Sequence, residues 1–121
     1  LVSGLTSAER AERALAGLLT SPRPPTAVLS GQNLIAEGAV RALWRAGLQH
    51  AIAHVGFDDL PLADVLDPGL TVIPQDPQHM GRLAAERLFR RLVGEALEAE
   101  HIIVPTRLIV RGSGEIRPVS P

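Results

Sequence analysis

Polar side chains follow three apolar stretches of this sequence, at the points where each stretch ends. They are Gln32 and Asn33, then Asp58 and Asp59, then Gln75 and Asp76. If the stretches are neighbouring parallel strands, these side chains lie at one edge of a sheet, where open α/β folds bind small ligands. Carboxylates and amides offer acceptors and donors in fixed planar geometry. They are therefore suited to neighbouring hydroxyls on a sugar or nucleoside.

Helix capping is the competing role for these polar side chains. Asn33, Asp59 and Asp76 each stand before a helical stretch, where Asn and Asp commonly act as caps. Asp58 and Gln75 are not needed as caps, so we favour them as ligand contacts. Phe57 directly precedes Asp58 and is the one aromatic side chain placed to approach a ligand.

The sequence gives weaker support for a metal site or a catalytic site. The histidines His50, His54, His79 and His101 lack metal-ligand spacing, which favours surface or edge positions and argues against a metal site. Ser113 lies between two glycines, but the stretch before it does not enter a helix, so a nucleophile elbow fails on context. An alternative hypothesis is an enzyme that uses Asp58 or Asp59 as acid, base or Mg²⁺ ligand. Phosphoryl transfer is less favoured, because the sequence has no lysine to stabilise a phosphoryl group.

Hydrophobic periodicity predicts the elements that must position these side chains. Strands are predicted over Thr26–Ser30, Ala51–Gly56 and Leu70–Ile73, and helices over Ser7–Leu19, Leu34–Ala46 and Pro77–Gly94. A helical turn is expected near Pro61. Two further β-rich runs, His101–Val104 and Arg107–Arg111, precede a Gly/Ser/Pro tail. This order of elements predicts an α/β fold with a mostly parallel sheet covered by helices.

Capping residues mark the ends of the predicted helices. Thr6-Ser7-Ala8-Glu9 has the form of a capping box before the first helix. Gly47 stands in the C-cap place after the second helix. Asp76 is a candidate N-cap of the third helix, and Pro77 is its first residue.

The composition narrows the class of protein. The chain has 121 residues, 45% of them apolar, and a formal net charge of −1. It can bury a core, but it has no electrostatic attraction of its own to nucleic acid or an anionic membrane. The sequence contains no cysteine, which excludes disulfides and thiolate chemistry and fits a cytoplasmic protein. No apolar run is long enough to span a membrane.

Apolar side chains at helical spacing are expected to form the core. Trp44 and Phe89 fall at such positions, and we expect them to be core residues rather than platforms for a sugar. A second apolar set, in the loop over residues 57–69, forms either core lining or a subunit interface together with polar residues of the second helix. Its members are Leu62, Val65 and Leu66, with Glu37 and Arg41 on the helix.

Several short motifs recur in order along nearly the whole chain. They are Pro25-Thr26-Ala27-Val28, Ala36-Glu37-Gly38-Ala39, Val55-Gly56-Phe57-Asp58-Asp59, Pro68-Gly69-Leu70-Thr71-Val72, Gln75 with Met80-Gly81 and Ala84-Ala85, and the run VPTRLIVRGS from Val104 to Ser113. The ordered series resembles the effector-binding core of LacI/GalR-family transcriptional regulators. One departure is the Gln32–Asn33 pair, which stands where that family usually has Asn-Asp, so an amide replaces a carboxylate.

The resemblance implies an α/β, parallel-sheet fold that is the C-terminal portion of a two-lobed, periplasmic-binding-protein-like type I fold. Residues 1–75 would belong to the C-terminal lobe, 76–105 to the N-terminal lobe, and 106–121 to a return strand and tail. Asp58 and Gln75 match effector contacts by position, as Gln32 and Asn33 match the usual Asn-Asp pair. The turn over Leu62 to Leu66 and the start of the second helix correspond to the dimer-contact region.

The function that the resemblance implies is that of a DNA-binding repressor with no catalytic residue, cofactor or metal. The chain would bind a small-molecule effector such as a sugar and form a homodimer. A separate N-terminal helix-turn-helix headpiece, outside this chain, would bind operator DNA. Because only the last third of such a protein is covered, the long helix is expected to expose Met80, Leu83 and Leu88. The alternative is a periplasmic sugar-binding transport protein of the same fold.

Overall fold

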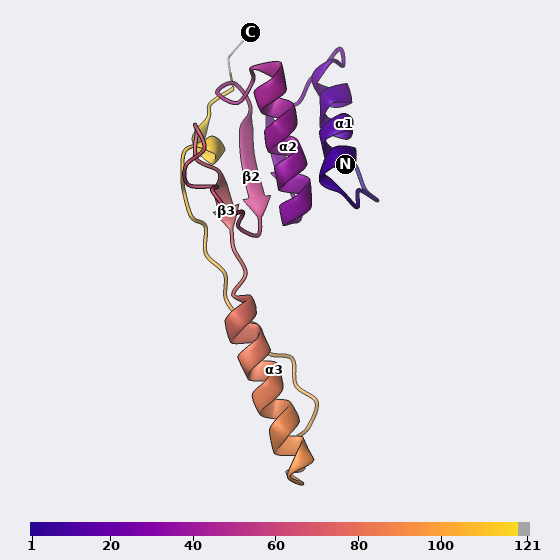
Figure 1. Cartoon of the computed structure of the whole chain (residues 1–121), viewed down its shortest axis with the longest axis vertical. Helices are drawn as coiled ribbons and strands as arrows, with labels where there is room; N and C mark the ends of the chain where they lie inside the picture. Colours follow the sequence, from indigo (N-terminus) through magenta and orange to yellow (C-terminus); the bar gives the residue numbers. More distant parts are fainter. Residues whose placement is uncertain (119–121) are drawn as a thin grey trace.

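The computed structural model describes residues 1–118, and its main body is built on a three-stranded parallel sheet in the order β1–β2–β3. The strands are β1 (Ala27–Ser30), β2 (Ala53–Phe57) and β3 (Thr71–Ile73). Helices α1 (Ala8–Leu19) and α2 (Asn33–Ala46) lie side by side against the sheet (Figure 1). This arrangement confirms the predicted α/β fold class.

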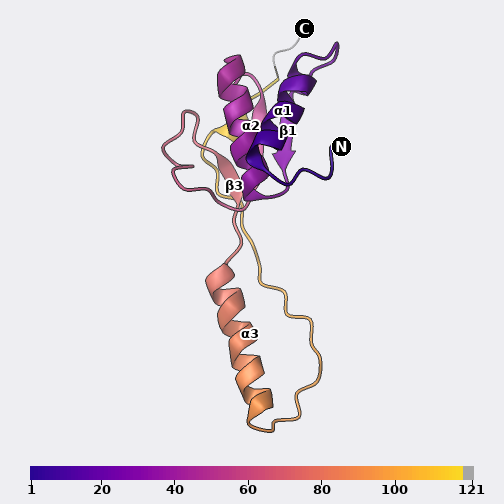
Figure 2. The same ribbon diagram turned by 45° about the vertical axis from the view of Figure 1, so that its right-hand side comes forward.

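The third helix, α3 (Pro77–Leu92), projects away from this body (Figure 1). None of its residues is buried. The chain then returns to the body in an extended segment that runs along the helix (Figure 2). Met80 and Leu88 are 45% and 57% exposed, as expected for an apolar helix face without a partner, whereas Leu83 is half-buried.

The helix ends follow the predicted capping residues with one shift. Ser7, and not Thr6, caps α1, and its hydroxyl accepts a backbone N–H hydrogen bond at 3.3 Å. Gly47 ends α2 in the left-handed conformation, with φ 68°, which glycine adopts without steric cost. Asp76 caps α3 by accepting a backbone N–H at 2.8 Å, with Pro77 as the first helical residue.

Small residues allow α1 and α2 to pack closely. A Cβ atom added to Gly38 would lie 2.2 Å from the carbonyl oxygen of Ala8 and 2.7 Å from the Cβ of Ala11. The apolar core forms two clusters, one beside α1 and one beneath the loop that precedes β3. Their buried members are Leu15, Ala39, Ala42, Leu43 and Ile52 in the first, and Ala36, Ala63, Leu70 and Val72 in the second.

The two β-rich runs near the C-terminus do not form strands, contrary to the prediction. Residues His101–Val104 belong to the extended segment beside α3, and Ile109 forms only an isolated antiparallel bridge with Val72. A strand needs a neighbouring strand to take up its backbone hydrogen bonds, and a helix cannot supply them. A short 3₁₀ turn, η1 (Ser113–Glu115), follows the second run and contacts β2.

Three side chains have a burial opposite to the prediction. His54, expected at a surface or edge, is 2% exposed, and its Nε2 lies 2.9 Å from the hydroxyl of Ser30. Burial lowers the pKa of His54 to about 4, so the ring is neutral at pH 7. Trp44 and Phe89, expected in the core, are 47% and 65% exposed. Trp44 is exposed because α2 buries mainly its small residues, and Phe89 because α3 buries none.

Candidate functional site

The candidate site lies where the body of the protein meets α3. An open cavity of about 500 Å³ is formed there by residues from the start of α2, the loop after β2 and the start of α3. Its lining residues are Asn33, Asp58, Asp59, Gln75, Pro77 and Met80. The register of the sheet explains this gathering, because Phe57 at the end of β2 pairs with Ile73 at the end of β3. The polar residues that follow both strands therefore meet at the carboxyl edge of the sheet, as predicted.

Asp58 and Gln75 form a direct contact. The side-chain amide of Gln75 donates a hydrogen bond to Oδ1 of Asp58 at 2.8 Å. Asp58 adopts a left-handed backbone conformation, with φ 71°, which costs a residue other than glycine about 1 kcal/mol. Its backbone N–H donates to the carbonyl of Ile73 at 3.0 Å. The loop therefore holds a carboxylate with acceptor capacity beyond the one bond from Gln75, beside an amide with its own acceptor oxygen.

Asp59 has a different partner from its neighbour. Arg111 forms a bidentate ion pair with Asp59, in which Nη1 donates to Oδ1 and Nη2 donates to Oδ2, each at 2.7 Å. The hydrogen bonds from Arg111 lower the pKa of Asp59 and outweigh the effect of its partial burial. Asp59 also accepts the N–H of Leu60 at 2.9 Å. Capping of the loop is thus a minor part of its role, because the charged pair takes both carboxylate oxygens.

The two amide residues at the start of α2, Gln32 and Asn33, differ in their position relative to the cavity. Asn33 lines the cavity with Asp58 and Gln75, and its Oδ1 accepts the N–H of Leu34 at 2.8 Å. Gln32 is the N-cap residue of α2, is exposed and makes no side-chain capping bond. The structure therefore brings Asn33 into the site and leaves Gln32 beside it.

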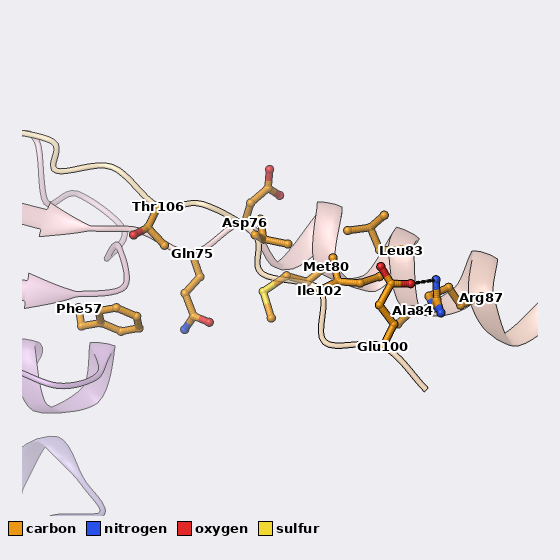
Figure 3. Close-up of a pocket in the computed structure, with 11 residues that line it drawn as sticks. Phe57, Gln75, Asp76, Met80, Leu83, Ala84, Arg87, Glu100, Ile102 and Thr106 are labelled. Carbon is orange, nitrogen blue, oxygen red and sulfur yellow. Dashed lines mark ion pairs between the residues drawn. The ribbon is translucent and has the colours of Figure 1, made fainter. Parts of the chain in front are cut away.

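Phe57 lies on the side of Gln75 that faces away from the cavity of Asn33 and Asp58. It lines one end of a second cavity of about 400 Å³, which lies mainly between α3 and the returning segment over residues 100–106 and which Gln75 and Met80 also line. Figure 3 shows the Gln75 side chain between the ring of Phe57 and the sulfur of Met80. The far end of this cavity is closed by an ion pair between Arg87 and Glu100, at 2.7 Å (Figure 3). Gln75 is thus shared by the polar cavity and the more apolar one.

The residues predicted for a dimer interface lie on α2 and on the loop before β3. Leu62 and Val65 are 69% and 68% exposed, whereas Leu66 is partly buried against the second core cluster. Glu37 and Arg41 form an ion pair along α2. The loop itself is a succession of turns and not a helix. The interface remains a prediction.

Arg111 and Ser113 also support the site, in roles that could not be predicted from the sequence. The hydroxyl of Ser113 donates to the carbonyl of His54 at 2.6 Å and accepts the N–H of Thr71 at 2.8 Å. It thereby fastens η1 to both β2 and β3. The only signal was the motif VPTRLIVRGS, which contains both residues but says nothing of partners up to 59 residues away along the chain.

Residues 1–118 contain no group of three or more His, Cys, Asp or Glu side chains that could hold a metal ion. No helix in the same range has the length and apolar content needed to cross a membrane.

The donor set at the carboxyl edge is one carboxylate and two amides, with a second carboxylate neutralised by arginine. This set suits hydrogen bonding to an uncharged, hydroxyl-rich molecule.

Comparison with known proteins identifies the family to which this chain is similar. Residues 2–114 match the periplasmic binding protein-like domain. The ribose operon repressor of Escherichia coli strain K12 is 36% identical over 102 residues, which are 83% of this chain and 31% of that protein. The chain therefore spans about a third of the length of the curated relative it matches.

Two solved structures share the fold closely. The lac repressor dimer bound to operator and the anti-inducer ONPF has a TM-score of 0.77 and 29% identity, over 89% of this chain and 33% of that one. A LacI family transcriptional regulator from Enterococcus faecium with bound ribose has a TM-score of 0.78 and 26% identity, over 92% and 41% of the two chains.

Proposed function

Because this chain belongs to the periplasmic binding protein-like domain family, among the LacI-type repressors, we propose that it is the effector-binding and dimerisation part of a DNA-binding transcriptional repressor. The effector that we propose is a sugar or a closely related polyol. The observation that carries the proposal is the Asp58–Gln75 contact, which lies at the carboxyl edge of a parallel sheet and beside the point where the chain leaves the body. No catalytic step is assigned to these residues.

The chemistry of the cavity supports an uncharged ligand rich in hydroxyl groups. Asp58 can accept hydrogen bonds from two neighbouring hydroxyls, while the amides of Gln75 and Asn33 can each donate and accept. Phe57 offers an apolar face on the far side of Gln75, against which the C–H face of a sugar ring can pack. The ribose operon repressor and the ribose-bound regulator are similar to this chain, which makes D-ribose the first ligand to test.

The arrangement of the chain supports a division between two lobes. We assign residues 1–75 to the C-terminal lobe, 76–105 to the N-terminal lobe and 106–121 to the return into the first. The body buries its own core, whereas α3 buries none of its residues. The segment after Thr106 attaches to β3 again through Ile109. A helix that projects with an exposed apolar face fits a lobe completed by other parts of a longer chain.

Dimerisation is proposed through the loop that carries Leu62 and Val65 and through the outer face of α2 with Glu37 and Arg41. Leu62 and Val65 are large, apolar and mostly exposed, which fits the apolar centre of an interface. The exposed Glu37–Arg41 pair on α2 fits a polar rim. Operator DNA would be bound by a headpiece outside this chain, in the cytoplasm.

The experiment uses the full-length gene product and measures sugar and DNA binding separately. Thermal unfolding is followed with D-ribose and with 2-deoxy-D-ribose, which lacks one of the hydroxyls that Asp58 could bind. At 100 times its Kd, a ligand stabilises the folded state by about 2.7 kcal/mol, so D-ribose should raise the Tm by several degrees and the deoxy sugar by less. Fluorescence anisotropy with duplex DNA should show binding that weakens steeply with salt.

Two results would contradict this function. Stabilisation by sugar without any DNA binding indicates a transport receptor of the same fold. DNA binding without stabilisation by D-ribose or other sugars removes the proposed effector class and leaves the regulator.

A further inference from the structure

Adjacent carboxylates hold the two places where the chain crosses between the body and α3. The outward crossing runs through Pro74 and Gln75, and the return crossing through Pro105 and Thr106; together they line one cavity. Asp58 accepts a hydrogen bond from Gln75 on the outward crossing. Asp59 pairs with Arg111, five residues beyond the return crossing. One turn of backbone thus contacts the outward crossing directly, and also the segment that follows the return crossing.

The Arg111 end of this second contact is held firmly to the sheet. Its backbone N–H donates to the hydroxyl of Thr71 at 3.0 Å, and the backbone on either side is bonded to β3 and to the loop before it, through Ile109 and Ser113. The Arg111 side chain is 19% exposed. The guanidinium is therefore presented from a fixed backbone, and its two parallel hydrogen bonds define the orientation of Asp59 as well as its distance.

Asp58 is the residue that needs such support. Its left-handed backbone persists only where its surroundings determine it. On one side the Asp58 N–H is bonded to Ile73 of the sheet at 3.0 Å. On the other side the chain continues into Asp59, whose side chain is locked by Arg111. The peptide that aims the Asp58 carboxylate into the cavity is therefore fixed at both ends.

We propose that Asp59 and Arg111 are positioning residues for the effector site. They hold the Asp58 carboxylate in its binding orientation, while their own charged groups are paired with each other. The inference deepens the proposed function, since it rests on Asp58 as an effector contact. Loss of the pair should free the turn over residues 58–60, so that the carboxylate samples other directions. Ligand affinity then falls although the ligand-binding atoms remain present.

The test uses the full-length protein with Asp59→Asn and Arg111→Met, each compared with the control Glu95→Gln. The control removes an exposed Arg–carboxylate pair, Arg90 with Glu95, whose residues line neither cavity. Amide hydrogen exchange, measured without ligand, should rise about tenfold or more in the peptide that covers residues 57–60 and stay unchanged in α1 and α2. The Kd for D-ribose should rise about tenfold in both variants and stay unchanged in the control.

The conservative variant Arg111→Lys separates positioning from a merely structural role. Lysine keeps the charge but cannot make two parallel hydrogen bonds. The exchange of residues 57–60 should therefore remain raised and the sugar affinity low, at a Tm close to that of the wild type. A uniform rise in exchange across the whole body, or a Kd for D-ribose unchanged in all three site variants, would overturn the inference.

The two readouts separate failure of this inference from failure of the proposed function. If the wild-type protein binds no D-ribose, the assigned sugar is wrong, and exchange confined to residues 57–60 still supports the positioning role. If the wild type binds D-ribose and Asp59→Asn binds it equally well, the effector site stands and the positioning role is refuted.

Discussion

Replacing Gly38 with alanine should destabilise the protein, whereas the same replacement at Gly17 should stabilise it. Both glycines lie in helices, Gly38 in α2 and Gly17 in the neighbouring α1. A new Cβ at Gly38 would meet the Ala8 carbonyl oxygen at 2.2 Å and the Glu12 nitrogen at 2.8 Å, both backbone atoms that cannot rotate away. At Gly17 no atom lies within 4 Å of the new group.

The expected magnitudes follow from these contacts. Alanine gains about 1 kcal/mol over glycine in a helix interior, and Gly17→Ala should show most of this gain. At Gly38 the gain is offset by overpacking, which typically costs about 1–3 kcal/mol. Because two backbone atoms must move, we place the cost at the upper end and expect a net loss of about 2 kcal/mol. The two variants should therefore differ by about 3 kcal/mol in the free energy of unfolding.

The assay is urea unfolding followed by far-UV circular dichroism, with the wild type and both variants in one buffer. The urea concentration at the midpoint should be highest for Gly17→Ala, intermediate for the wild type and lowest for Gly38→Ala. The dependence of the free energy of unfolding on urea concentration should be the same for all three. A Gly38→Ala midpoint equal to or above that of the wild type would refute the close approach of α1 and α2. An unchanged Gly17→Ala midpoint would point to a frayed end of α1.

Three further predictions concern burial, the C-terminal turn and the proposed interface. His54 has a pKa of about 4 in the folded protein against 6.5 in the unfolded chain, so below pH 6.5 the unfolded chain binds a proton that the folded protein does not. The free energy of unfolding should therefore be highest above pH 6.5 and fall by about 2 kcal/mol by pH 5. His54→Gln should not show this loss. Ser113→Ala removes two buried hydrogen bonds and should lower the free energy of unfolding by about 1–3 kcal/mol; a variant as stable as the wild type argues against the docked turn. Leu62→Ser with Val65→Ser should convert a dimer to a monomer in light scattering without changing the far-UV circular dichroism spectrum, and a variant that stays dimeric rules out this surface.

The order of elements and the address of the site could be predicted because both depend on local sequence. Short β-branched runs followed by turn residues gave the three strands within two residues of their observed ends. Asp58 and Gln75 stood at consecutive strand ends, and the parallel register that joins Phe57 to Ile73 brings them together. The capping roles of Asp76 and Gly47 depend on a few neighbouring residues and were therefore visible in the sequence.

Partners far apart in the sequence could not be predicted in this way. The Asp59–Arg111 pair joins residues 52 positions apart, and no periodicity links them. The burial of His54 depends on Ser30 and on the turn at Ser113, which only the folded chain brings together. Phe89 lies at a core-like helical position, yet α3 buries none of its residues in the described part of the chain. Helical spacing indicates which face is apolar, not whether another element covers it.

Calorimetric titration of D-ribose into the full-length protein tests most directly whether Asp58 binds a sugar effector. Wild type, Asp58→Asn and the control Asp67→Asn, an exposed aspartate outside the cavity, are titrated in parallel. Saturable binding at one site per chain is expected for the wild type and the control. Loss of the charged acceptor should weaken Asp58→Asn about 10- to 100-fold. Equal affinity for D-ribose in all three proteins would contradict the assignment of Asp58.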